Sequence, residues 1–246
     1  KNKNLSSKNF EKIYKDSGIY ILKKNKNYFL STNSKVGTGG IGNHKHNDNF
    51  SFCLSFDDDD FFQDIGTFHY GSDLLNRYNY RSIYNHNSFQ KLGEEPNNLN
   101  KKKPWNAYED SYPKNFVKYE NNITKIFYFR AYMKYPKKTF YERSFEINKK
   151  NFNIKFEDKL NSNYNGIVRW SFNLGHKVKI KKKKQYLILF TNKKKIILQY
   201  DQKLKYSIKN IYVYPSFGKK IKSKKIIFQT FSSKNKFEKF TFNIIN

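Results

Sequence analysis

The chain has 246 residues, 37% hydrophobic and 19% aromatic, which is enough to build one large β domain with an aromatic core. A single cysteine excludes an intramolecular disulfide framework. No apolar run approaches the roughly 18 residues that a membrane-spanning helix needs, so we expect no membrane span.

The formal net charge of +29 has two explanations. A polyanionic partner, either a nucleic acid or an acidic polysaccharide, would favour such a surplus of lysine. The alternative is codon bias, because Lys, Asn, Ile, Phe and Tyr are abundant together, as an AT-rich genome would produce. The lysines are scattered, apart from runs at 101–103, 181–184 and 193–195 that are typical of solvated strand ends or turns.

The first predicted elements are strands. Residues 18–22 and 27–31 are rich in strand-forming residues and flank a polar turn, which predicts a β-hairpin. A helical period is present only weakly, at 9–15. Residues 36–42 form a glycine-rich loop that leads into the first histidines.

A second hairpin is predicted after the histidines. Residues 50–56 alternate apolar and polar side chains, which indicates a strand with one apolar face. The four aspartates at 57–60 lack the spacing of an EF-hand loop, so a solvated turn is the better interpretation. Residues 61–65 then form the returning strand.

The rest of the chain divides into an irregular part and a series of strands. Residues 72–115 are polar with few strand patterns, and long loops of this kind are often functional. Short strand patterns separated by turns follow, at 125–134, 140–147, 152–156, 167–174, 186–190, 196–200, 211–215, 225–231 and 237–244. Without an internal repeat or linker, they predict a single all-β domain, an antiparallel sandwich or barrel.

Histidines and an aspartate give the strongest chemical signal. His44 and His46 precede the strand at 50–56, and pairing with the strand at 61–65 would bring Asp64 back beside His46. His86 follows a loop in the irregular region. Two histidines and a carboxylate form an ordinary zinc site, whereas the alternative is that these are hydrogen-bonded loop residues.

The segment GNHKHNDNFSFCLSF, followed by DIGTFHY and RYNYRSIYNHN, resembles the β-domain signature of the heparinase II/III-like polysaccharide lyases. That signature is similar to G-H-x-H-x-D-x-L-S-F, D-x-G-T-x-x-Y and R-x-Y-x-R-S-x-x-x-H-N. The match is close over 42–89 and weaker after about 150. Asn43 and Phe50 depart from the residues usual at their positions.

The resemblance implies roles for individual residues. It implies that a structural zinc is bound by His46, Asp64 and His86. It implies catalytic roles for His44, on the substrate side, and for Tyr70 and Tyr78, which border the cleft. Two arginines, which could instead form structural ion pairs, are candidates for binding a substrate carboxylate or sulfate: Arg77 and Arg81.

The resemblance also implies a fold and an activity. The fold is an antiparallel β-sandwich of the supersandwich kind, covering residues 1–246, and the chain is expected to be part of a longer protein with an N-terminal α/α-toroid domain. The implied activity is β-elimination of an acidic polysaccharide such as a glycosaminoglycan or alginate, in the periplasm or cell envelope. The alternatives are a non-catalytic glycan-binding or structural domain and, ranked lower, nucleic-acid binding, because no recognition helix or RNA-binding aromatic motif is present.

Overall fold

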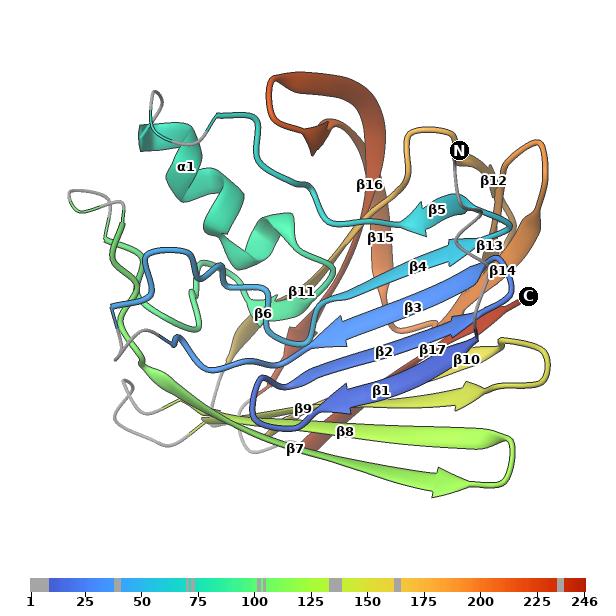
Figure 1. Ribbon diagram of the computed structural model, residues 1–246, viewed down its shortest axis with the longest axis horizontal. Helices are drawn as coiled ribbons and strands as arrows, with labels where there is room; N and C mark the ends of the chain where they lie inside the picture. The colour runs from blue at the N-terminus through green and yellow to red at the C-terminus, as the bar shows by residue number, and fades with distance from the viewer. Residues whose placement is uncertain are drawn as a thin grey trace, which may run out of the picture.

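The computed structural model describes residues 9–37, 41–69, 71, 74–100, 103, 105–132, 139–161, 165–233 and 237–246. Within these residues the chain forms three antiparallel sheets of five, eight and four strands (Figure 1). The predicted all-β antiparallel fold is therefore confirmed.

The first sheet is a meander in which each strand pairs with its neighbours in sequence. Its strands are β1 (Phe10–Tyr14), β2 (Ile19–Lys24), β3 (Asn27–Thr32), β4 (Phe52–Phe56) and β5 (Asp59–Phe62). Both predicted hairpins are present, formed by β2 with β3 and by β4 with β5. The weak helical period at 9–15 does not produce a helix, because β1 lies there and pairs with β2, and this pairing outweighs local propensity.

The second sheet has the strand order β12-β13-β14-β17-β10-β9-β8-β7. Its strands are β7 (Ser111–Glu120), β8 (Ile123–Tyr132), β9 (Thr139–Asn148), β10 (Ile154–Asn161), β12 (Lys179–Lys182), β13 (Tyr186–Phe190), β14 (Lys195–Tyr200) and β17 (Phe237–Ile245). The sequence patterns miss β7 and β12, the two edge strands. Strand β12 is largely exposed, and the large apolar residues of β7, such as Phe116 and Tyr119, are exposed, so neither strand shows an apolar face turned to the core that alternation could reveal.

The third sheet has the order β15-β16-β11-β6. Its strands are β6 (Phe89–Lys91), β11 (Gly166–Asn173), β15 (Lys205–Ser216) and β16 (Lys219–Ser232). Aromatic side chains join the sheets, since the ring centroid of Phe52 lies 5.8 Å from that of Phe145 in the second sheet and 5.8 Å from that of Phe172 in the third. The three sheets therefore share one aromatic core.

A short helix interrupts the region that the sequence predicts to be irregular. Helix α1 (Leu74–Arg81) and the 3-10 turn η2 (Ile83–Asn85) lie beyond the ends of the strands in Figure 1. The buried side chains of α1 include two arginines, Arg77 and Arg81. Because this buried face is not a stripe of aliphatic residues, hydrophobic periodicity does not reveal the helix.

An ion pair is buried inside the core. Arg143 of β9 donates from Nε and Nη2 to the two carboxylate oxygens of Asp158 on β10, at 2.6 and 2.5 Å, and both side chains are fully buried. The indole N–H of Trp170 on β11 donates to the same carboxylate at 2.8 Å. Nη1 of Arg143 donates to the carbonyl oxygens of Phe50 and Asn87, at 2.7 and 3.0 Å. One guanidinium therefore connects the second sheet to the segments that precede β4 and β6.

Replacing Arg143 with Met should lower the free energy of unfolding by about 3–5 kcal/mol, because Asp158 would remain as a buried carboxylate without its partner. Guanidinium unfolding followed by tryptophan fluorescence measures the change. The control is Lys155→Gln, which removes a partly exposed ion pair with Glu157 and should cost less than about 1 kcal/mol. An equally small loss for Arg143→Met would contradict the structural role.

Candidate active site

The three predicted metal ligands lie together although they come from separate segments. His46 lies in the loop between β3 and β4, whose residues 41–51 we call the histidine loop. Asp64 follows β5, and His86 ends the turn η2. Nδ1 of His86 is 2.6 Å from Oδ2 of Asp64, and the ring centroids of His46 and His86 are 5.4 Å apart. The β4–β5 hairpin returns Asp64 to the histidine loop, as the predicted pairing requires.

His86 has one imidazole nitrogen that no neighbour satisfies. Its side chain is 1% exposed, and Nε2 is buried without a hydrogen-bond partner among the described residues. Burial alone would lower the pKa of His86, but the Asp64 carboxylate outweighs burial and raises it. A buried polar atom without a partner calls for an explanation, and a bound ion is one.

The donor set is of a kind that binds zinc, since it combines two imidazoles and a carboxylate. Burial and the neighbouring His86 lower the pKa of His46 to about 4, so this imidazole is neutral near pH 7, the form that binds a metal. Within the described ranges, no group of three or more His, Cys, Asp or Glu side chains is arranged as a metal site. Zinc binding by these residues therefore stays a prediction.

Two arginines of α1 hold the loop that carries both histidines. Arg81 donates from Nε to the carbonyl of Lys45 at 2.8 Å and from Nη2 to the carbonyl of Gly42 at 2.7 Å. Arg77 donates to the carbonyl of Asn43 at 2.7 Å. The two arginines share one face of α1 because they are four residues apart, and both are buried. Their contact with a substrate stays a prediction, and the contacts described position the loop.

The same loop is stabilised by close packing and an internal ion pair. Gly42 has φ of +56°, and a Cβ there would lie 2.3 Å from Cγ1 of Val36, so a larger residue would not fit. Nζ of Lys45 donates to Asp48 at 2.5 Å and to Ser34 at 2.8 Å. Burial disfavours the charge of Asp48, but the ammonium of Lys45 outweighs burial and lowers the pKa of Asp48 to about 2. The carboxylate of this pair therefore stays ionised.

The two histidines of the loop, His44 and His46, differ in their exposure to solvent. His44 is exposed, whereas Lys45 is buried and His46 is partly buried. Tyr78 on α1 is also partly buried, and burial together with the Glu95 charge raises its pKa. Tyr70, the other tyrosine predicted to be catalytic, lies outside the described residues. The catalytic assignments of these residues remain predictions.

Polar residues around the histidines form stabilising contacts that the sequence motifs do not reveal. Nδ2 of Asn47 donates to Glu95 at 2.6 Å and to the carbonyl of Asn97 at 2.8 Å, which anchors the histidine loop from a second side. The guanidinium of Arg77 lies 3.8 Å above the ring of Trp105, which is 38% exposed. Contacts between residues this far apart in sequence leave no local pattern.

Lys225 of β16 supports the turn η2. Its Nζ donates to the carbonyl of Tyr84 at 2.8 Å and to Oδ1 of Asn85 at 2.7 Å, and it lies 3.9 Å from the Tyr84 ring centroid. Burial, together with the charges of Lys209 and Arg169, lowers the pKa of Lys225 to about 7. Lys225 is therefore held close to the turn that ends at the histidine cluster, and it releases its proton near neutral pH.

The family model described as heparinase II/III-like, C-terminal, matches residues 11–238. The chain belongs to this family. The fold is also that of solved structures: heparan sulfate lyase HepC from Pedobacter heparinus has a TM-score of 0.78 at 17% identity, over 100% of this chain and 37% of that one. Heparinase III has a TM-score of 0.78 at 18% identity, over 96% of this chain and 36% of that one. At such identities the likeness shows the fold alone.

This member of the heparinase II/III-like family spans little more than a third of the length of those two enzymes. No curated protein sequence matches it significantly. In the described part of the chain, no helix has the length and apolar character needed to cross a membrane.

We expect Lys225 to make the free energy of unfolding rise with pH between about 7 and about 10.5. In this window the unfolded chain still binds the proton that the folded protein has released, and stability rises wherever the unfolded state binds more protons. Subtracting the values for Lys225→Met at each pH isolates this effect, with a slope of up to about 1.4 kcal/mol per pH unit. If the difference, measured by chemical denaturation, did not vary with pH, the lowered pKa would be refuted.

Proposed function

We propose that this chain is the β-sandwich part of a polysaccharide lyase that acts, together with an N-terminal toroid domain, on a polysaccharide containing uronic acid. The observation that carries the proposal is the histidine loop: it presents an exposed His44, Arg77 and Arg81 hold its backbone, and His46 lies beside His86, which contacts Asp64. Family membership supports it, and HepC, which has the same fold, is a heparan sulfate lyase.

The residue types suit β-elimination. The C5 proton of a uronic acid is weakly acidic, so the neighbouring carboxylate has to be neutralised by hydrogen bonds or positive charge. The imidazole of His44 then accepts the proton, the electron pair forms the C4–C5 double bond, and the bond from C4 to the linking oxygen breaks. A tyrosine, Tyr78 or Tyr70, protonates the departing oxygen.

Zinc, when bound by His46, Asp64 and His86, would act as a structural ion that stiffens the loop carrying His44. The buried Nε2 of His86, which has no partner among the described residues, supports this assignment. The elimination itself is assigned to the side chains of the protein.

The proposed activity predicts that the full-length gene product generates unsaturated uronate ends, detected by their ultraviolet absorbance, when it is incubated with heparan sulfate or another uronate polysaccharide. His44→Ala should lower kcat by about 10²-fold to 10⁴-fold, because a general base is lost. Lys12→Ala, an exposed change on β1, should leave kcat unchanged. Binding of the polysaccharide with no unsaturated product would favour a non-catalytic glycan-binding domain instead.

The zinc assignment predicts about one zinc per chain by elemental analysis of the purified protein. The metal should be lost from His46→Ala and from Asp64→Asn, and the thermal unfolding temperature should fall in parallel. His69→Ala serves as a control that also removes a histidine but should retain the metal. Metal-free protein with full thermal stability would contradict a structural zinc.

A further inference from the structure

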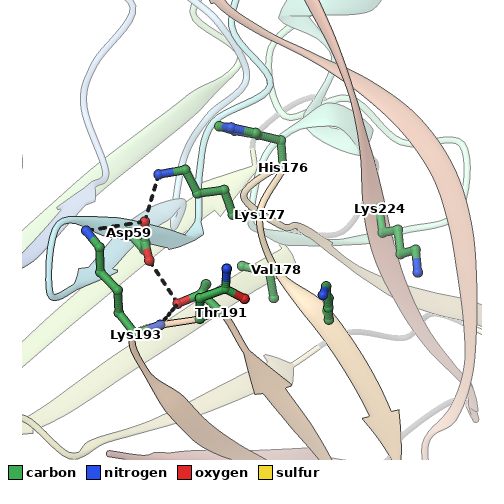
Figure 2. A pocket seen from close by; sticks show the side chains of 9 residues that line it. Asp59, His176, Lys177, Val178, Thr191, Lys193 and Lys224 are labelled. Atoms are coloured by element: carbon green, nitrogen blue, oxygen red, sulfur yellow. Dashed lines mark hydrogen bonds and ion pairs between the residues drawn. The ribbon is translucent and has the colours of Figure 1, made fainter.

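A second concave site lies near the start of β5, at the opposite end of this strand from Asp64 (Figure 2). The pocket has a volume of about 510 Å³. It forms where β5 meets residues 176–179, the turn between β13 and β14, and one residue of β16, so four separate segments build it. No motif in the sequence predicts it.

The pocket is strongly cationic. Four lysines line it, and a single carboxylate opposes them, which leaves a formal surplus of three positive charges. The lysines are Lys177, Lys179, Lys193 and Lys224. A concave surface with charges of one sign focuses the electrostatic potential more strongly than the same charges spread over a flat surface.

The one carboxylate is already satisfied within the protein. The side chain of Asp59 is 2% exposed and accepts hydrogen bonds from Lys177 at 3.0 Å and from Oγ1 of Thr191 at 2.8 Å. Lys193 lies 3.9 Å from the same carboxylate. Figure 2 shows both lysines directed at Asp59, which therefore fixes two cationic side chains at the rim of the pocket.

Two further lysines are not compensated. Lys179 and Lys224 are exposed, and within the described part of the chain neither forms an ion pair. Lys179 starts β12, whereas Lys224 lies on β16 of another sheet. Both line the pocket, in which Asp59 is already paired, so an anion from solution could pair with them.

We propose that this pocket binds a sulfate or carboxylate group of an acidic saccharide, as a subsite remote from the histidine loop. The proposal rests on the proposed function for its ligand class. Asp59 and Asp64 are five residues apart, so their Cα atoms are separated by at most about 18 Å. A single polysaccharide chain is long enough to contact the pocket and the histidine loop together.

The test compares two double variants that remove the same charge. Lys179→Gln with Lys224→Gln neutralises the pocket, and Lys150→Gln with Lys203→Gln neutralises two exposed lysines that do not line it. Binding of a heparan sulfate hexasaccharide is measured by calorimetry at a fixed ionic strength of about 0.15 M, since screening alters all such contacts. We expect about tenfold weaker binding for the pocket variant and less than a twofold change for the control.

Two outcomes would overturn the proposal. Equal weakening in both variants would mean that the saccharide responds to net charge alone. A single-stranded DNA of matched charge could displace the hexasaccharide equally well from the unchanged protein and fail to bind the pocket variant. That result would assign the pocket to nucleic acid instead. The assay needs no cleavage, so a chain without lyase activity could still show the pocket effect. An active lyase with no difference between the two variants would refute the pocket alone.

Discussion

The buried pair of Arg143 and Asp158 is the interaction on which the other features of this fold depend. Nη1 of Arg143 donates to the carbonyls of Phe50 and Asn87. Phe50 lies at the end of the histidine loop, and Asn87 directly follows His86. Phe50 has φ of +62°, a conformation that large side chains rarely adopt, and its carbonyl bond to Arg143 helps to offset that cost. The core ion pair thus holds in place both segments that contribute the clustered histidines.

Side-chain bonds to the backbone, rather than strand pairing, then align the parts of the site. Asn87 donates from Nδ2 to the carbonyls of Phe52 and Gln63, at 2.8 and 3.1 Å, and its Oδ1 accepts from the backbone N–H of Asn173 at 2.6 Å. One amide therefore fixes the spacing between β4, the end of β5 and β11. Because hydrogen bonds have a narrow range of favourable distances and angles, these bonds restrict the buried segments beneath the histidine loop. His44 of the same loop is exposed to solvent.

The alternation of apolar and polar residues in the sequence predicted those strands that have one face in the core and the other toward solvent. The hairpin of β2 and β3, and strands such as β13 and β14, have one face in the core and so show a period of two. Edge strands β7 and β12 and helix α1 escaped prediction. The edge strand β12 is mostly exposed, the large apolar residues of β7 are exposed, and α1 is held by Arg77 and Arg81 through bonds to a distant loop.

The amino-acid sequence by itself determined the fold class, the aromatic core and the family, because strand patterns and the motif around His44, His46 and His86 are properties of neighbouring residues. The pairing of β4 with β5 also follows from a local turn, which is why the approach of Asp64 to the histidines was predictable. Only the tertiary structure decided that Arg77 and Arg81 hold the loop, that Arg143 joins the sheets, and that lysines from two sheets surround one pocket. Those contacts join residues far apart in sequence, and their energies depend on burial and on distances that exist only once the sheets have packed.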